Sequence, residues 1–276
     1  VSAYKAERFL DKRCENLLNQ VEQNIEVIIT VPNSPDGTAE IAQKWSERDS
    51  RIKFIPYPER DNYGESWLRC WENASGELVS NSNSDDATDK FFTTIVYDEF
   101  MSALQKNDKL AFCYTGLNTV SEDGKLLGRG IKPPFDFEVM SRECWAGPAV
   151  TWRNDEEFKN KLDFNHLYKR AKILNSGFDY ALWLYFLSLG YYGYSIPKIL
   201  LTYVKRNDSI ENSNKWANNW DTFVSIAEYF PIHFENILKQ YKEFVSFPRV
   251  PKRNIWIDLM QRNQKWKEEY EWQIMD

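Results

Sequence analysis

The chain has 276 residues, of which 42% are hydrophobic and 28% charged, a balance that excludes a disordered chain. Its formal net charge of −6 excludes general nucleic-acid binding, which needs a basic surface. The four cysteines contain no CxxC pair and predict reduced thiols in a cytoplasmic protein, and the 2 histidines are too few for a histidine-based metal cluster.

The first half of the chain alternates helices and strands. Apolar residues three and four positions apart predict an amphipathic helix over 6–21, and the β-branched run at 25–31 predicts a buried strand. The turn Asn33–Gly37 is rich in helix-capping residues and leads into a second helix. A strand at 52–57, a helix at about 66–74 and a strand at 77–83 follow. This order predicts an α/β domain whose central sheet is mostly parallel and covered by helices on both faces.

The second half is less regular. It predicts a helix at 89–106, a strand at 109–115, a hairpin at 118–128, a strand at 148–153, a helix at 178–189, short strands near Tyr192 and Leu200, and only helices from about 211. The uncharged stretch 180–197 contains Gly190, Gly193 and Pro197, so helix, turn and strand explain it better than a membrane span.

Two units are expected along the chain: a domain over 1–210 and a helical C-terminal extension over 211–276 packed on it. The last helix, 254–275, carries charges of both signs, which favours packing on the domain or a partner over the alternative of lying on a membrane surface. Since the first helix begins almost at once, Val1–Tyr4 is expected to be the tail of a first strand.

Candidate ligand-binding residues follow the predicted strands. Ligands of open α/β sheets gather at the carboxyl ends of the strands, which here are Val1–Tyr4, Val31–Gly37 and Asn83–Asp86. Asp85 and Asp86 directly follow a strand, and their hard oxygen ligands suit Mg²⁺ or Mn²⁺ bridging phosphate oxygens. The alternative is that Asp86 to Asp89 caps the next helix.

Five ordered segments resemble a known family. They are VSAYKAERFLDKRCENLLNQ, IEVIITVPNSPDGTAEIAQKW, DSRIKFI, NASGELVSNSNSDD and GFDYALWLYFLSLGYYGYSIPKILLTYVKRNDSI, and they span residues 1 to about 211. In order and spacing they resemble the inverting family 2 glycosyltransferases with the GT-A nucleotide-diphospho-sugar transferase fold. The resemblance implies transfer of a sugar from a nucleotide-diphosphate donor, usually UDP-linked, to a hydroxyl of a glycan or glycoconjugate acceptor, with Mn²⁺ or Mg²⁺ as cofactor.

The resemblance also assigns roles to individual residues. Asp85 matches the metal ligand of the Asp-x-Asp position, and Asp179 matches the catalytic base. The donor-binding positions are Ser2, Tyr4, Val31, Arg69, Asn83, Ser84, Asp85, Gly147 and Arg206. A carboxylate such as Asp179 in the first turn of a helix also stabilises the helix dipole, which is the structural alternative to a catalytic role.

The chain departs from the family pattern at several positions. Lys5 replaces the usual Asn after the first strand, Val31 stands where the family reads uracil with Asp, and Asn83 replaces the first Asp of the metal motif. The usual Arg-Asn of the helix before that motif aligns with Trp67-Leu68, and Arg69 follows. These changes keep open a degenerate domain that binds a nucleotide sugar without catalysis, but the presence of both carboxylates at the metal and base positions favours an enzyme.

Two other interpretations were weighed on residue type. A nucleotidyltransferase would need a glycine-rich basic loop after the first strand, and Ala3–Glu7 is not one. Four tryptophans are candidates for stacking on sugars, although packing in the core is the better explanation of each: Trp67, Trp71, Trp145 and Trp152.

Overall fold

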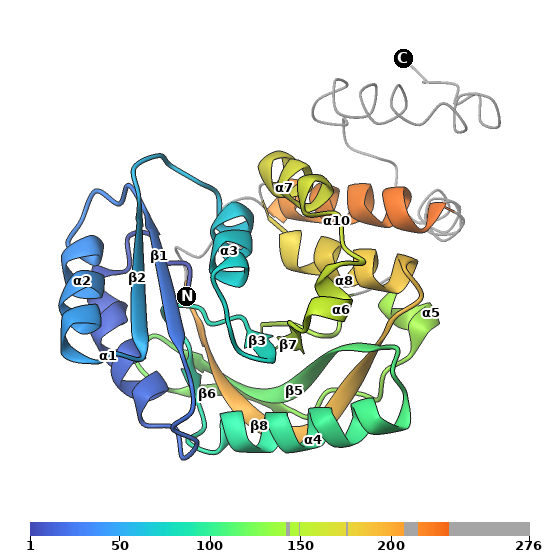
Figure 1. Cartoon of the computed structure of the whole chain (residues 1–276), viewed down its shortest axis with the longest axis horizontal. Helices are drawn as coiled ribbons and strands as arrows, with labels where there is room; N and C mark the ends of the chain where they lie inside the picture. The colour runs from blue at the N-terminus through green and yellow to red at the C-terminus, as the bar shows by residue number, and fades with distance from the viewer. Residues whose placement is uncertain (142–143, 149, 175, 207–214, 232–276) are drawn as a thin grey trace.

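Two β-sheets, one of two strands and one of six, organise the chain, and helices pack on them (Figure 1). The computed structural model describes residues 1–141, 144–148, 150–174, 176–206 and 215–231. The helix predicted at 254–275 therefore lies outside the described residues.

The first layer contains two parallel strands and two helices: α1 (Glu7–Leu18), β1 (Val27–Pro32), α2 (Thr38–Arg48) and β2 (Ile52–Tyr57). Every residue of β1 is buried, as its β-branched composition predicts. Val27, Ile29 and Val31 pack against α1 and α2. The opposite face of β1 contacts α3 (Tyr63–Glu72), so β1 is covered on both sides.

The N-terminal residues pair with β1 as an extended segment, through isolated bridges rather than as a full strand. The Thr30 amide donates to the Val1 carbonyl and the Ala3 amide donates to the Thr30 carbonyl, each at 3.0 Å. Ser2 forms parallel bridges with Thr30 on one side and Asn83 on the other. This short segment thereby joins the β1–β2 sheet to the rest of the molecule.

The second sheet has the strand order β3–β7–β5–β8–β4, with β6 paired to β5. These strands are β3 (Leu78–Ser80), β4 (Ala87–Thr88), β5 (Leu110–Ser121), β6 (Leu126–Gly130), β7 (Val150–Arg153) and β8 (Tyr192–Lys205). Within this sheet only β5 and β8 pair in parallel among the described strands. The predicted parallel pairing therefore holds for β1–β2 and β5–β8, and the other strand pairs are antiparallel, so the sheet is mixed. The antiparallel β5–β6 pair follows from the hairpin after β5, because the chain turns back there without the helical crossover that parallel pairing requires.

Helices cover the two faces of this second sheet (Figure 1). Helix α4 (Phe92–Lys106) packs Phe92, Val96 and Phe100 against one face. Helices α3 and α8 (Phe178–Ser188) cover the other through an aromatic core that includes Trp71, Phe112, Trp152, Trp183 and Phe186. Trp71 and Trp152 are therefore core residues, as expected, and cannot stack on a sugar. Helix α8 is apolar and buried except at Asp179 and Ser188, which lie near its two ends.

Short helices that the sequence analysis did not predict complete the fold. They are α5 (Phe137–Met140), α6 (Glu156–Lys159) and α7 (Phe164–Ile173). The α6 and α7 helices each begin after an aspartate, Asp155 or Asp163, whose carboxylate accepts from a backbone amide at 3.0 Å. Helix α10 (Lys215–Tyr229) belongs to the expected C-terminal extension and packs on α8. Within the described residues, no helix combines the length and apolar character needed to cross a bilayer.

Candidate active site

The loop after β3 brings two predicted site residues together. Asp85 Oδ2 lies 2.7 Å from Arg206 Nε, and both side chains are mostly buried, at 14% and 19% exposure. Arg206 follows the last residue of β8, and its guanidinium also lies 4.9 Å from the centre of the Phe9 ring. A carboxylate and an arginine from the ends of two strands thus meet at one edge of the sheet, where ligands of α/β folds bind.

Asp86 holds its loop against β8 through hydrogen bonds. It is 5% exposed, and it accepts hydrogen bonds from the Val204 amide at 3.0 Å and Asn83 Nδ2 at 2.8 Å. Burial, reinforced by the charge of Asp85, raises the pKa of Asp86 to about 6. The alternative from sequence was that Asp86 to Asp89 caps the next helix. Asp89 does accept a hydrogen bond from the Phe91 amide at 2.8 Å. Asp86 instead ties the loop to β8.

A buried arginine that the sequence analysis missed supports this loop. Arg13, on α1, is only 2% exposed and donates to Ser82 Oγ at 2.8 and 3.0 Å and to Asn16 Oδ1 at 2.7 Å. Burial lowers its pKa to about 10, opposed by Asp86 and Asp85, so the guanidinium stays charged at neutral pH. The signal was present in the sequence, because Arg13 stands three residues after Leu10 on the apolar stripe of the first helix.

The other end of the site is lined by aromatic and cationic side chains. The Arg60 guanidinium lies 5.2 Å from the centre of the Tyr4 ring. Arg69 lies 3.5 Å from the centre of the Tyr57 ring and pairs with Asp61 at 2.6 Å. Flat rings and planar guanidinium groups at the ends of β-strands offer surfaces on which a nucleoside base and phosphates can bind.

Unusual backbone conformations occur at the same edge. Lys5 has φ 52° and Asn33 has φ 20°, and these are the positive values among the described residues other than glycine. The Lys5 amide donates to Ser34 Oγ at 2.9 Å, and the Asn33 amide donates to the Tyr57 carbonyl at 2.8 Å. The loops after the N-terminal strand, β1 and β2 are therefore linked to one another.

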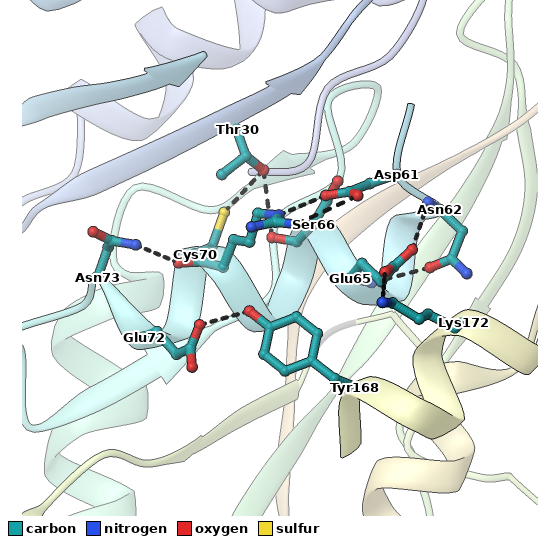
Figure 2. Close-up of polar contacts among 11 residues, drawn as sticks. Thr30, Asp61, Asn62, Glu65, Ser66, Cys70, Glu72, Asn73, Tyr168 and Lys172 are labelled. Carbon is teal, nitrogen blue, oxygen red and sulfur yellow. Dashed lines mark hydrogen bonds and ion pairs between the residues drawn. The ribbon is translucent and has the colours of Figure 1, made fainter. Parts of the chain in front are cut away.

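Helix α3 is fixed at its N-terminus and along its length (Figure 2). Asn62 and Glu65 form a capping box, with the Glu65 amide donating to Asn62 Oδ1 at 3.0 Å. Thr30 Oγ1 of β1 lies 3.3 Å from Cys70 Sγ, and the Tyr168 hydroxyl of α7 donates to Glu72 at 2.5 Å. The helix that carries Arg69 is thus held between β1 and α7. In the same helix Trp67 stacks on Trp152.

The predicted residue Gly147 lies in a turn that is hydrogen-bonded to Asn81, just after β3. Gly147 has φ 67°, a conformation that favours glycine, and the Lys132 amino group would lie 3.3 Å from a Cβ at this position. Asn81 Nδ2 donates to the Pro148 carbonyl at 2.6 Å, and the Val150 amide donates to Asn81 Oδ1 at 3.0 Å.

Asp179 lies in the first turn of α8, and this turn packs beside α3. The preceding amide, of Phe178, donates to the Tyr63 hydroxyl at 2.5 Å. Burial and then the negative charge of Asp179 raise the pKa of Tyr63 well above its ordinary value, so this phenol stays protonated. The charges of Asp179 and Lys132 both act on the Cys144 thiol.

Exposure separates one predicted residue from the rest. The other predicted site residues are partly exposed and therefore accessible: Ser2, Tyr4, Arg69, Asn83, Ser84, Asp85, Gly147, Asp179 and Arg206. Val31, in β1, is 3% exposed and packs against α1 and α2. Since its side chain points into the core, a donor could reach Val31 only through its backbone.

The residues at the sheet edge fit a divalent cation held jointly with a substrate. No group of three histidine, cysteine, aspartate or glutamate side chains gathers anywhere in the described part of the chain. Mg²⁺ and Mn²⁺ bound to nucleotides do not need such a cage, because one or two carboxylates and the phosphates complete their coordination. Asp85 offers one carboxylate and Asn83 a carbonyl oxygen, whereas Asp86 is already engaged.

Comparisons with known proteins identify the type of enzyme. Residues 1–106 match the model of Glycosyl transferase family 2. The putative teichuronic acid biosynthesis glycosyltransferase TuaG of Bacillus subtilis (strain 168) is 27% identical over 236 residues, covering 84% of this chain and 87% of that protein. The chain is a glycosyltransferase, and its first 106 residues are similar to family 2. This glycosyltransferase is also 27% identical over 195 residues to the Escherichia coli UDP-Glc:alpha-D-GlcNAc-diphosphoundecaprenol beta-1,3-glucosyltransferase WfaP, covering 69% of each chain.

Solved structures confirm the predicted GT-A fold. S. aureus TarS 1-349, solved with UDP, superposes with a TM-score of 0.57 at 15% identity, covering 94% of this glycosyltransferase and 77% of that chain. The mannosyltransferase PcManGT from Pyrobaculum calidifontis, solved with GDP-Man and Mn²⁺, gives a TM-score of 0.52 at 13% identity, covering 91% and 64%. At these identities the likeness concerns the fold.

Proposed function

We propose that this glycosyltransferase moves a sugar from a nucleotide-diphosphate donor, a UDP-sugar, to a hydroxyl of a glycan or glycoconjugate acceptor with inversion at the anomeric carbon. The observation that carries the proposal is the Asp85–Arg206 ion pair, which joins the loop after β3 to the end of β8. Tyr4, Arg69 and Asp179 would complete the site around it. TarS was solved with UDP and UDP-GlcNAc, and the name of WfaP specifies a UDP-Glc donor and a lipid-diphosphate acceptor.

The donor would lie along this edge. Tyr4, Arg60 and Arg69 supply surfaces for the nucleoside, and Ser2, Asn83 and Ser84 line the path toward Asp85. Asp85 would hold Mg²⁺ or Mn²⁺, and the bound ion would neutralise charge on the leaving diphosphate. Arg206 can turn from Asp85 to the phosphate oxygens, because a guanidinium binds carboxylate and phosphate with the same planar set of donors.

Asp179 would act as the general base. An alcohol is a weak nucleophile at neutral pH, so the acceptor hydroxyl must lose its proton as its oxygen attacks the anomeric carbon. The new carbon–oxygen bond forms on the face opposite the diphosphate, the bond to the phosphate oxygen breaks, and its electron pair leaves with the diphosphate. The proton passes to the Asp179 carboxylate. Gly147 and Pro148 would border the sugar between the base and Asp85.

The boundaries and location of the enzyme are part of the same proposal. The transferase domain would cover 1–210, and 211–276 would be a helical extension, of which α10 packs on α8. Cys14, Cys70, Cys113 and Cys144 are all free thiols, which supports a reducing, cytoplasmic setting. The helix suggested for membrane or partner contact, 254–275, lies outside the described residues.

A donor panel and one pair of variants test the proposal without a known acceptor. UDP-glucose, UDP-GlcNAc and GDP-mannose are first compared by thermal shift with and without Mn²⁺, since a ligand of the folded state raises the melting temperature. Slow hydrolysis of the best donor is then followed by UDP or GDP release. The Asp179→Asn variant should lose about 10²–10⁴-fold in rate with unchanged nucleotide binding, and Asp98→Asn, an exposed aspartate on α4, is the matched control.

Two results would contradict this function. A native rate of donor hydrolysis in the Asp179→Asn variant would mean that Asp179 is not the general base. NMR of the first sugar released from an α-linked donor decides the stereochemistry, and an initial α-anomer would mean retention rather than inversion.

A further inference from the structure

The turn that precedes Asp179 has no capping side chain at its N-cap position. Gly177, at the N-cap of α8, has φ 69° and ψ 14°, and no side chain at this position caps the helix. The conformation and the first amides of α8 therefore depend on residues from other elements. The direction in which Asp179 points is set by whatever holds this turn.

Helix α10 supplies one such contact through a buried carboxylate. Asp221 is 5% exposed, and its Oδ2 accepts from the Ser176 amide at 2.9 Å and from Ser176 Oγ at 3.4 Å. A Cβ at Gly177 would lie 4.0 Å from the Asp221 Cβ and 3.8 Å from Thr222 Oγ1, so α10 lies directly against the turn. Ser225 Oγ donates to the Asp221 carbonyl at 2.9 Å within the same helix.

Helix α3 holds the other side of the turn. The Tyr63 hydroxyl accepts from the Phe178 amide, and a Cβ at Gly64 would lie only 2.7 Å from the Phe178 ring. The negative charges of Asp179 and Asp221 both act on the Tyr63 phenol. The Ser176–Phe178 segment is thus clamped between α3 and α10.

We propose that Asp221 is a positioning residue for Asp179. This inference rests on the proposed role of Asp179 as the base. Asp221 fixes the Ser176 amide, the Ser176 amide fixes the left-handed turn at Gly177, and the turn fixes the first residues of α8. Misplacement of a catalytic group by about 1 Å can cost about 100-fold in rate, so a contact far from the bond being made can control turnover. The proposal gives α10, which lies outside the residues that match the family model, a part in catalysis.

Two variants separate positioning from simple stability. Asp221→Ala removes the acceptor of both hydrogen bonds, whereas Asp221→Asn keeps a carbonyl oxygen that can accept them. Ser225→Ala is the matched control, since it removes a buried hydrogen bond of the same helix without touching the turn. Each variant is measured for hydrolysis of the best donor, for nucleotide binding by calorimetry and for hydrogen exchange of the peptide that contains Ser176 and Phe178.

In Asp221→Ala, hydrolysis should fall about 10- to 100-fold with unchanged nucleotide affinity, and exchange should rise in that peptide. Asp221→Asn should restore most of the rate, and Ser225→Ala should match the native enzyme. A native rate in Asp221→Ala, or equal losses in Asp221→Ala and Ser225→Ala, would overturn the inference. Asp179→Asn is assayed in parallel: its inactivity beside a native Asp221→Ala rejects the positioning role alone, and its full activity rejects the proposed base.

Discussion

Replacing Arg13 with methionine tests whether the buried guanidinium stabilises the loop that carries Asp85 and Asp86. Methionine retains much of the length of arginine but has no charge and no donors. The substitution removes three hydrogen bonds and leaves Ser82 Oγ without the two donors that reach it from Arg13. Asn16 is less affected, because its Oδ1 also accepts from the Thr88 amide at 2.9 Å.

The size of the effect depends on what is left behind. Exchanging a complete buried ionic group for apolar residues can be neutral, but removing one partner typically costs about 3–5 kcal/mol. Arg13→Met leaves Asp86 buried without the nearby cation that favours its charged form. Because Asp86 keeps its bonds to Val204 and Asn83, we expect the lower end, about 3 kcal/mol.

Urea unfolding monitored by fluorescence measures this cost as a shift in midpoint at constant slope. Arg8→Met, at an exposed arginine on the same helix, is the control and should stay within about 0.5 kcal/mol of the native protein. If the cost comes from the Asp86 carboxylate left without Arg13, the double variant Arg13→Met/Asp86→Asn should lose less free energy of unfolding than the sum of the losses in the two single variants. An Arg13→Met variant as stable as the native protein would refute the reasoning.

Three further predictions concern the donor site and helix α7. Asp85→Asn should remain folded and lose Mn²⁺-stimulated donor hydrolysis, and full activity of this variant, or of the native enzyme in excess chelator, would contradict the metal role. Arg206→Gln should weaken UDP binding by about 1.5–3 kcal/mol, seen by calorimetry as a fall in affinity of about 10- to 150-fold. Burial, reinforced by Arg170, lowers the pKa of His166, so the unfolded state takes up its proton first. Stability present above about pH 6.5 should therefore fall as the pH drops through the folded-state pKa, and His166→Gln should flatten that thermal-shift profile.

Much of the first half of the fold was predictable because local signals agree there. The continuous β-branched run of β1, the amphipathic stripe of α1 and the capping residues around Asp36 each indicate one structure. The second half was harder, since its strand directions depend on how distant segments pair. The sequence predicted separate short strands near Tyr192 and Leu200, and the structure has a single strand, β8, whose register shifts as it passes β5.

The candidate site divides in the same way. The positions of Asp85, Arg206 and Asp179 at strand and helix ends follow from element order, which sequence gives. The roles of Arg13 and Asp221 do not, because each is defined by a partner more than forty residues away. For Val31 the sequence suggested a role that the structure does not support. Its position aligns with base recognition, but its apolar side chain is part of the core.

The charges around the Asn83–Asp86 loop support a requirement for a cation with the donor. Arg13 behind the loop and Arg206 in front of it offset the charges of Asp85 and Asp86, so this part of the site is close to neutral before a ligand binds. A diphosphate bound alone would add negative charge to a partly buried site in a chain of net charge −6, where unpaired charge is costly. A diphosphate bound with Mg²⁺ or Mn²⁺ adds little net charge, and Arg206 need not leave Asp85 unpaired. The balance therefore favours joint binding of nucleotide and cation, so UDP affinity should rise with Mn²⁺ in the native enzyme and respond much less in Asp85→Asn.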